Sequence, residues 1–250
     1  MIAESQLNGS SAAAFFDLDG TLIPGPTLEW RFFSALRKNG RIPITTYCRL
    51  AGEAVRLLRK GPLAACHENK KYLTGVPKDS VFRYMDSILF FDQGIARVAW
   101  HARQGHAIFL VSGTLEPLAQ LAATALECEL EARGISAQPC VCATRLQEVR
   151  GDWTGRVAGG ACYGRAKARL LAALAAAEEI DLRHCHAYGN SLLDRHFLGA
   201  VGYAHAVNPS RDLAALANDK NWPVWHWHRD TPSASPQAAH LPQSMPDIEE

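Results

Sequence analysis

The sequence lacks the long apolar run that a bilayer-crossing helix requires. It also shows no secretory leader, since the short apolar run 12–16 leads directly into Asp17. The formal net charge is only +1, and lysine and arginine are scattered along the chain. A protein held on nucleic acid usually carries a basic stripe instead. We therefore expect no membrane insertion and no nucleic-acid partner.

A disulfide framework is also not indicated, because the seven cysteines are odd in number and spread along the chain. Free thiols in a reducing cytosol explain this usage better, so we expect a cytoplasmic protein. The chain has 250 residues, of which 48% are hydrophobic and 20% are charged. These values are ordinary for a globular protein. They fit one domain, or one domain that carries a smaller insertion.

Apolar runs of strand length alternate with segments of helical periodicity. The predicted strands are 12–16, 106–111 and 185–188, and the predicted helices are 95–101, 118–133 and 166–179. A hairpin is expected around Arg150-Gly151-Asp152, between strands at 141–145 and 153–157. Strands separated by helices predict an α/β fold with a Rossmann-like parallel sheet, whose ligands gather at the carboxyl ends of the strands.

Residues 27–91 have a helical pattern instead, with breaks at Gly40, at Gly61-Pro62 and at 75–77. We expect this segment to form a small helical cap inserted after the first strand. The resulting division is a core of 11–26 and 92–229, a cap of 27–91, and a disordered tail of 230–250. The tail is rich in Pro, Ser and Gln.

Two acids follow the first predicted strand, in the sequence Asp17-Leu18-Asp19-Gly20-Thr21. An ionised carboxylate can attack phosphorus as a covalent nucleophile, and a second acid nearby can pass a proton to the leaving oxygen. Gly20 lets the backbone approach a phosphate closely. Taken alone, the motif is equally well a polar turn that ends a strand. A calcium loop is excluded, because it requires Asp or Asn at Thr21 and a later Glu.

Three further polar groups follow in a consistent order. Ser112 and Gly113 end the second strand, Lys167 opens a helix, and Asn190 and Asp194 follow the third strand. Each has an ordinary structural interpretation by itself, as a helix cap, a solvated lysine or a turn. Four independent coincidences in the correct order are much less probable than one shared site, so we expect these residues to converge.

The sequence resembles the haloacid dehalogenase superfamily, in its phosphoserine-phosphatase-like branch, over roughly residues 12–228. The resemblance is carried by DLDGTL at 17–22, VSGT at 111–114, CYGRAK at 162–167 and YGNSLLD at 188–194. It implies a Mg²⁺-dependent hydrolase that acts on a small phosphorylated metabolite. Asp17 would be the nucleophile that forms an aspartyl-phosphate, and Asp19 the general acid and base.

The same resemblance implies the remaining roles. Thr21, Ser112 and Gly113 would bind the phosphoryl group, and Lys167 would offset its charge. Magnesium would be held by Asp17, Asp19 and the residue at position 190, with Asp194 nearby.

Position 190 departs from the family pattern, which has Asp where this chain has Asn190. The amide oxygen still suits a hard cation, but one negative charge is lost. We expect activity that needs more magnesium. The alternative is a catalytically impaired phosphate-binding or regulatory protein with the same fold, and a phosphotransferase is a third possibility. A dehalogenase is disfavoured, because such enzymes need neither the second acid nor the metal.

Several other residues are interpreted as structural. His226 and His228 are placed on an edge strand with no third metal ligand, and Cys140 and Cys142 in a buried strand. His184 and His186 are likewise interpreted as structural. Aromatic side chains at 30, 32 and 33 are expected to pack the cap, with one of them able to face substrate.

Overall fold

The computed structural model describes residues 12–42, 44–59, 68–85 and 87–229. The predicted disordered tail and the predicted break at Gly61-Pro62 therefore lie outside the described residues. No helix in these ranges is long and apolar enough to cross a membrane.

Seven strands form one sheet in the order β4-β3-β2-β1-β5-β6-β7. The strands are β1 Ala13–Phe16, β2 Ala107–Leu115, β3 Cys140–Val149, β4 Asp152–Ala158, β5 His186–Gly189, β6 Tyr203–Val207 and β7 Val224–Trp225. All neighbours are parallel except β3 and β4, which form the predicted antiparallel hairpin. The prediction of an α/β fold with a mostly parallel sheet is confirmed.

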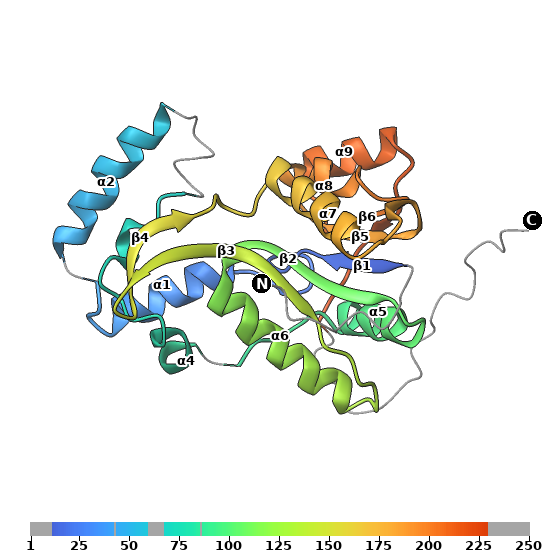
Figure 1. Cartoon of the computed structure of the whole chain (residues 1–250), viewed down its shortest axis with the longest axis horizontal. Helices are drawn as coiled ribbons and strands as arrows, with labels where there is room; N and C mark the ends of the chain where they lie inside the picture. The colour runs from blue at the N-terminus through green and yellow to red at the C-terminus, as the bar shows by residue number, and fades with distance from the viewer. Residues whose placement is uncertain (1–11, 43, 60–67, 86, 230–250) are drawn as a thin grey trace, which may run out of the picture.

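The helices are α1 Leu28–Lys38, α2 Ile44–Leu58, α4 Ser80–Tyr84, α5 Asp92–Arg103, α6 Glu116–Glu131, α7 Arg165–Ala177, α8 Arg195–Leu198 and α9 Arg211–Asp219. Short 3₁₀ turns lie at η1 Lys71–Leu73, η2 Leu182–His184 and η3 Leu192–Asp194. Figure 1 shows α5 and α6 on one side of the sheet and α7, α8 and α9 on the other.

Strand β1 is buried on both faces and therefore joins two cores. Ala14 and Phe16 pack with the cluster on the α5 and α6 side, whereas Ala13 and Phe15 pack with the cluster on the α7 to α9 side. This alternation follows from the two-residue period of a strand. Because helices cover both faces, polar groups are accommodated where the central strands end, and the site is found there.

Helices α1, α2 and α4 lie between β1 and β2 in sequence, where the helical cap is expected. The β3–β4 hairpin reaches this segment, because Trp153 exchanges backbone hydrogen bonds with Gly75 and Val76 (2.8 and 3.0 Å). The Trp153 ring also packs edge-on against Phe32. The inserted helices and the hairpin therefore share one apolar cluster beside the sheet. Figure 1 shows β4 beside α1 and α2.

Two strands end elsewhere than the sequence predicts. Strand β2 continues through Ser112 to Leu115, because Leu115 pairs with Thr144 after an irregularity in the register. Strand β7 ends at Trp225, so His226 and His228 are not on a strand. The backbone N–H of Trp227 donates to the Asn208 side chain (2.8 Å) in place of a neighbouring strand.

Candidate active site

The expected site residues line one cavity of about 720 Å³ at the carboxyl ends of the central strands. They come from segments far apart in the sequence. The cavity is lined by Asp17, Asp19, Ser112, Gly113, Lys167, Asn190 and Asp194. Thr21 is not among the lining residues but hydrogen-bonds to Asp17, and it is fully buried.

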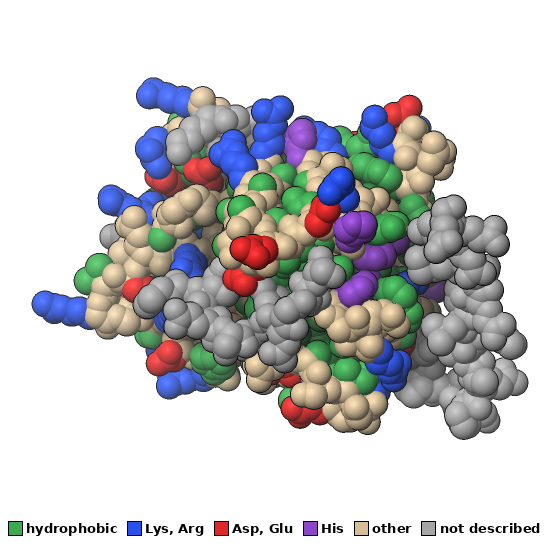
Figure 2. Space-filling view, turned by 45° about the vertical axis from the view of Figure 1, so that its right-hand side comes forward, with side chains coloured by type: hydrophobic (Ala, Val, Ile, Leu, Met, Phe, Trp, Pro, Cys, Tyr) green, Lys and Arg blue, Asp and Glu red, His purple; other side chains and the backbone are tan. Residues whose placement is uncertain are grey.

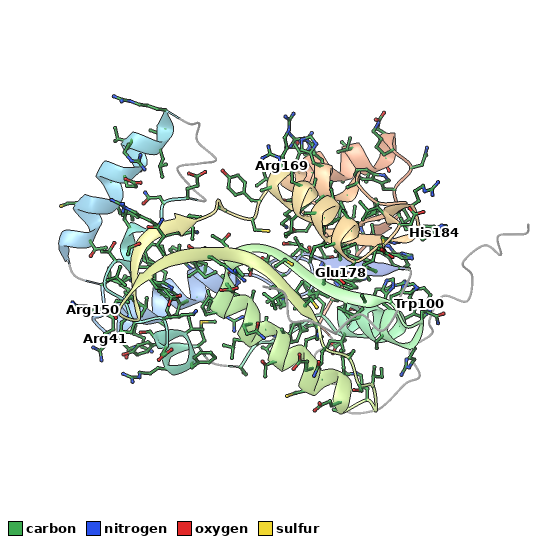
Figure 3. The ribbon with its side chains drawn as sticks, in the orientation of Figure 1. Arg41, Trp100, Arg150, Arg169, Glu178 and His184 are labelled. Atoms are coloured by element: carbon green, nitrogen blue, oxygen red, sulfur yellow. The ribbon has the colours of Figure 1, made fainter. Side chains whose placement is uncertain are left out.

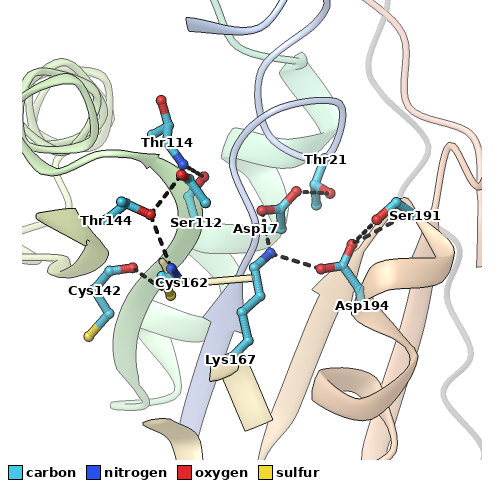
Figure 4. A network of polar contacts seen from close by, with 11 residues as sticks. Asp17, Thr21, Ser112, Thr114, Cys142, Thr144, Cys162, Lys167, Ser191 and Asp194 are labelled. Atoms are coloured by element: carbon cyan, nitrogen blue, oxygen red, sulfur yellow. Dashed lines mark hydrogen bonds and ion pairs between the residues drawn. The ribbon is translucent and has the colours of Figure 1, made fainter. Parts of the chain in front are cut away.

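Asp17 follows β1 directly, and its backbone N–H donates to the carbonyl of Tyr188 on β5 (3.0 Å). This bond fixes where the carboxylate leaves the sheet. Lys167 donates to Asp17 Oδ1 at 2.7 Å, and Thr21 donates to Oδ2 at 3.3 Å (Figure 4). Burial raises the pKa of Asp17 to about 6, although the Lys167 ammonium opposes the rise.

Lys167 lies in the first turn of α7 and is 4% exposed. Its ammonium group bridges two carboxylates, Asp17 at 2.7 Å and Asp194 at 2.8 Å. Burial alone would lower the pKa of Lys167, but the two carboxylates raise it above its ordinary value. The lysine therefore stays charged and links the end of β1 to η3.

Asp194 is almost fully buried, and both of its carboxylate oxygens accept hydrogen bonds. Oδ1 accepts from Lys167, and Oδ2 accepts from the backbone N–H and the hydroxyl of Ser191 (3.1 and 3.0 Å). The carboxylate thus holds Lys167 in place and caps the short η3 turn. These contacts describe a positioning residue more directly than a metal ligand.

Asp19 projects from the loop after β1, two residues beyond Asp17. The backbone N–H of Leu28 at the start of α1 donates to its Oδ1 at 2.7 Å, which ties the acid to the inserted segment. Burial raises the pKa of Asp19 to about 7, and the Leu28 N–H lowers it less than burial raises it. A carboxyl with this pKa exchanges a proton near neutral pH.

Asn190 follows β5 and packs its amide against the backbone at Gly20. A Cβ on Gly20 would overlap the Asn190 side chain, and the Gly20 backbone has a φ of +83°. Both observations require glycine there. The amide is thereby placed beside the loop that carries both acids.

The opposite wall is formed by the irregular end of β2. Ser112 is 1% exposed, and its hydroxyl accepts from the backbone N–H of Thr114 (3.3 Å). Thr144 donates to the Gly113 carbonyl (2.8 Å) and fixes this segment against β3 (Figure 4). The Thr114 hydroxyl is buried and has no hydrogen-bond partner in the described part of the chain. Thr114 is part of the VSGT motif but is not among the predicted site residues. The burial of its hydroxyl without a partner identifies it as a further candidate site residue.

A second polar group, whose pairing the sequence did not predict, lies at the α1 end of the cavity. Lys70, which is 4% exposed, donates to both carboxylate oxygens of Glu29 (2.5 and 2.6 Å), and Tyr72 donates to Glu29 Oε1 (2.6 Å). Apolar side chains complete this end of the wall: Trp30, Phe33, Leu50 and Ala54. The charges of Glu29 and Lys70 therefore cancel locally.

The haloacid dehalogenase-like hydrolase model matches residues 14–199, which is most of the chain. The chain belongs to this family. A probable phosphatase of Mycobacterium tuberculosis is 36% identical over 232 residues, which cover 87% of this chain and 76% of that protein. A phosphoserine phosphatase of the same organism is 27% identical over 231 residues, covering 86% and 70%.

The fold of this haloacid dehalogenase-like protein is also found in solved structures. A Bordetella pertussis protein of unknown function superposes with a TM-score of 0.66 at 23% identity, covering 86% of this chain and 98% of that one. The family and the relatives indicate a phosphatase of the phosphoserine-phosphatase-like branch. The solved structures agree with the fold.

Proposed function

We propose that this protein hydrolyses a small phosphate monoester through an aspartyl-phosphate on Asp17, with Mg²⁺ as its cofactor. The observation that carries the proposal is the buried Lys167–Asp17 pair in a cavity that also contains Asp19 and the Ser112 and Thr114 hydroxyls. A nucleophile, an acid, a cation and hydroxyl donors then surround one space of a size suited to a small ligand.

The contacts of the residues in and beside the cavity support a role for each of them in this reaction. Thr21 and Lys167 hold the Asp17 carboxylate from two sides, so that it attacks in a fixed orientation. Asp19 gives its proton to the leaving oxygen and afterwards accepts one from the attacking water. The hydroxyls of Ser112 and Thr114 donate to phosphoryl oxygens, and the Lys167 ammonium stabilises the charge that develops there.

The oxygen atoms of the loop after β1 and of the Asn190 side chain suit magnesium. The carboxylate of Asp17, the backbone carbonyl of Asp19 and the amide of Asn190 supply hard oxygen ligands of the kind that Mg²⁺ prefers. When bound, the ion would neutralise phosphoryl charge. Asp194 would act beyond the direct ligands, through a bound water, since its carboxylate already accepts three hydrogen bonds, one from Lys167 and two from Ser191.

The α1 end of the cavity bears on the leaving group. Glu29 is held by Lys70 and Tyr72 and is therefore not free to bind an amino group. The neighbouring surface is apolar, with Trp30 and Phe33 in the wall. A metabolite with an apolar or uncharged leaving group fits this surface better than phosphoserine does. We further propose a cytoplasmic location, because seven cysteines, an odd number spread along the chain, do not suit a disulfide framework.

The test is a phosphate-release assay of purified protein over a library of phosphorylated metabolites, with magnesium varied. We expect at least one substrate, saturable magnesium dependence, and a loss of at least about 10³-fold in kcat for Asp17→Asn. Acid-quenched protein should retain labelled phosphate on Asp17. Turnover that survives in Asp17→Asn contradicts the nucleophile assignment.

Asn190 favours a second candidate, a phosphate-binding or regulatory protein with an impaired metal site. In that case phosphate would raise the melting temperature, the library would give no turnover, and Asn190→Asp would restore it. A phosphotransferase would be distinguished by a phosphorylated alcohol among the products.

A further inference from the structure

Four histidines gather toward the amino ends of the central strands, at the opposite end of these strands from the phosphatase cavity. His101 lies in α5, His106 precedes β2, His186 begins β5, and His205 lies in β6. Figure 2 shows histidine side chains gathered on the face that it presents, and Figure 3 labels the adjacent Trp100 at the end of the molecule far from Arg41. None of these histidines lines the phosphatase cavity.

Three of them present nitrogen atoms to one point. One ring nitrogen each of His101, His106 and His186 lies within 4.8 Å of the other two. Tetrahedral ligands about 2.0–2.1 Å from a zinc ion lie about 3.3 Å apart. Small movements of the three rings would therefore bring their nitrogen atoms to the distances that zinc requires. His101 is fully buried and His186 is 6% exposed, whereas His106 is half-buried and leaves a route from solvent.

The contacts of His101 place its Nδ1 lone pair toward the nitrogen atoms of the other histidines. Its Nδ1 lies 2.9 Å from Nδ1 of His106, so either a proton or a cation must lie between these two acceptors. Its Nε2 lies 2.8 Å from the hydroxyl of Tyr188, which is fully buried. If Nε2–H donates to that hydroxyl, Nδ1 is free to bind a metal, which is the usual arrangement for a metal-bound histidine.

A metal binds the neutral form of imidazole, and the burial of His101 and His186 disfavours the charged form. Arg97 packs over the rings of Trp100 and Trp225 (5.5 and 4.7 Å) and repels any cation here. A weakly bound ion is therefore disfavoured, and only a metal with high affinity for imidazole overcomes the repulsion.

We propose that His101, His106 and His186 form a site for a divalent transition metal of the zinc type, separate from the magnesium site. Three imidazoles with a water as fourth ligand suit Zn²⁺ and Co²⁺, whereas Mg²⁺ prefers oxygen. The proposal is independent of the phosphatase mechanism, because it shares no ligand with the catalytic cavity.

The same network opposes metal binding at one point. Trp225 donates its Nε1–H to Nδ1 of His205 (3.2 Å), so His205 carries its proton on Nε2 and donates to Nδ1 of His186 (3.1 Å). His186 must then carry its own proton on Nε2, the nitrogen left to face the metal. Binding therefore moves that proton to Nδ1, reverses the His186–His205 bond and releases Trp225.

The test uses the full chain without an affinity tag, in excess Mg²⁺ and inorganic phosphate to occupy the catalytic cavity. Equilibrium dialysis against Zn²⁺ should give one ion per chain, and Co²⁺ should give the intense visible absorption of a four-coordinate ion. His106→Ala and His106→Gln should each lose at least tenfold in affinity while they keep the circular dichroism of the parent. His184→Ala is the matched control, because that histidine is exposed and lies outside the group; it should leave binding unchanged.

Trp225→Phe tests the proton movement. Since it removes the donor that holds His205 in the opposing tautomer, we expect Zn²⁺ affinity to rise at least fivefold. Tryptophan fluorescence of the parent should change on titration with a midpoint equal to that from dialysis. Equal zinc binding by the parent and both His106 variants, or no bound zinc in the parent, overturns the site. Unchanged affinity in Trp225→Phe overturns the tautomer coupling.

Discussion

Replacing Lys167 by methionine tests how the site is held together. Methionine keeps most of the length of the side chain but removes the ammonium that bridges Asp17 and Asp194 at 2.7 and 2.8 Å. All three side chains are nearly inaccessible to solvent. Removing one partner of a buried charge cluster costs about 3–5 kcal/mol, because the remaining carboxylates are left without compensation. For a chain of this length that corresponds to a melting temperature lower by about 6–20 °C.

The sign of the pH dependence is a second readout. Without Lys167 the pKa of Asp17, already raised by burial, rises further. The folded variant then binds more protons than the unfolded chain above about pH 4, so its stability falls as pH increases. The difference from the parent should therefore be largest near pH 8 and should shrink toward pH 5.

Urea unfolding of both proteins at pH 8 and pH 5, without added metal, measures this difference. Lys78→Met is the matched control, since its ion pair with Glu148 (3.0 Å) is more than one-third exposed on both sides. That control should change the free energy of unfolding by less than about 1 kcal/mol at either pH. If Lys167→Met lowers the free energy of unfolding by less than about 1 kcal/mol, or by the same amount at both pH values, the stabilising role of the Lys167 ammonium is refuted.

Three shorter predictions concern other positions. Asn190→Asp should lower the magnesium concentration for half-maximal phosphatase rate at least about tenfold; an unchanged midpoint in a magnesium titration would contradict a ligand role. Gly20→Ala should destabilise the fold by more than about 1 kcal/mol in urea unfolding and lower kcat, because its Cβ would meet Asn190 at a positive φ; parent-like values would be contrary evidence. In EDTA, lowering the pH from 7 to 5 should lower the free energy of unfolding by about 2 kcal/mol through His205. Its folded pKa of about 3 lies below the ordinary 6.5, so the unfolded chain takes up the proton first. Urea unfolding measures the loss, and His205→Gln should reduce it.

The cavity at the carboxyl ends of the strands was predictable because its determinants are local. Each expected residue stands at the end of an apolar strand or at the start of a helix, and a parallel sheet brings such ends to one edge. Thus Asp17 and Asn190, 173 positions apart in the sequence, could be placed in one cavity from their positions alone. The hairpin around Gly151 was predictable for the same reason, because its turn residues and both strands are neighbours in the sequence.

Contacts between distant segments that share no such rule were not predictable. The ion pair of Glu29 and Lys70 joins residues 41 positions apart across the inserted segment, and no motif indicates it. The histidine group comes from three separate elements, and only His186 was noticed, with a structural interpretation. The length of β7 depended on a side-chain acceptor, Asn208, which ended the strand at Trp225.

The charges around the site explain why an uncharged residue is favourable at position 190. Lys167 already compensates both Asp17 and Asp194, whereas Asp19 has the Leu28 N–H as its hydrogen-bond donor. A further carboxylate beside Gly20 would raise the pKa values of its neighbours and destabilise the protein whenever no metal is bound. In the proposed magnesium site, asparagine would remove that repulsion and keep an oxygen for the cation, so metal affinity would be exchanged for stability of the metal-free fold. An active phosphatase and a phosphate-binding relative would then differ in how much magnesium the site requires, and not in the arrangement of Asp17, Asp19 and Lys167.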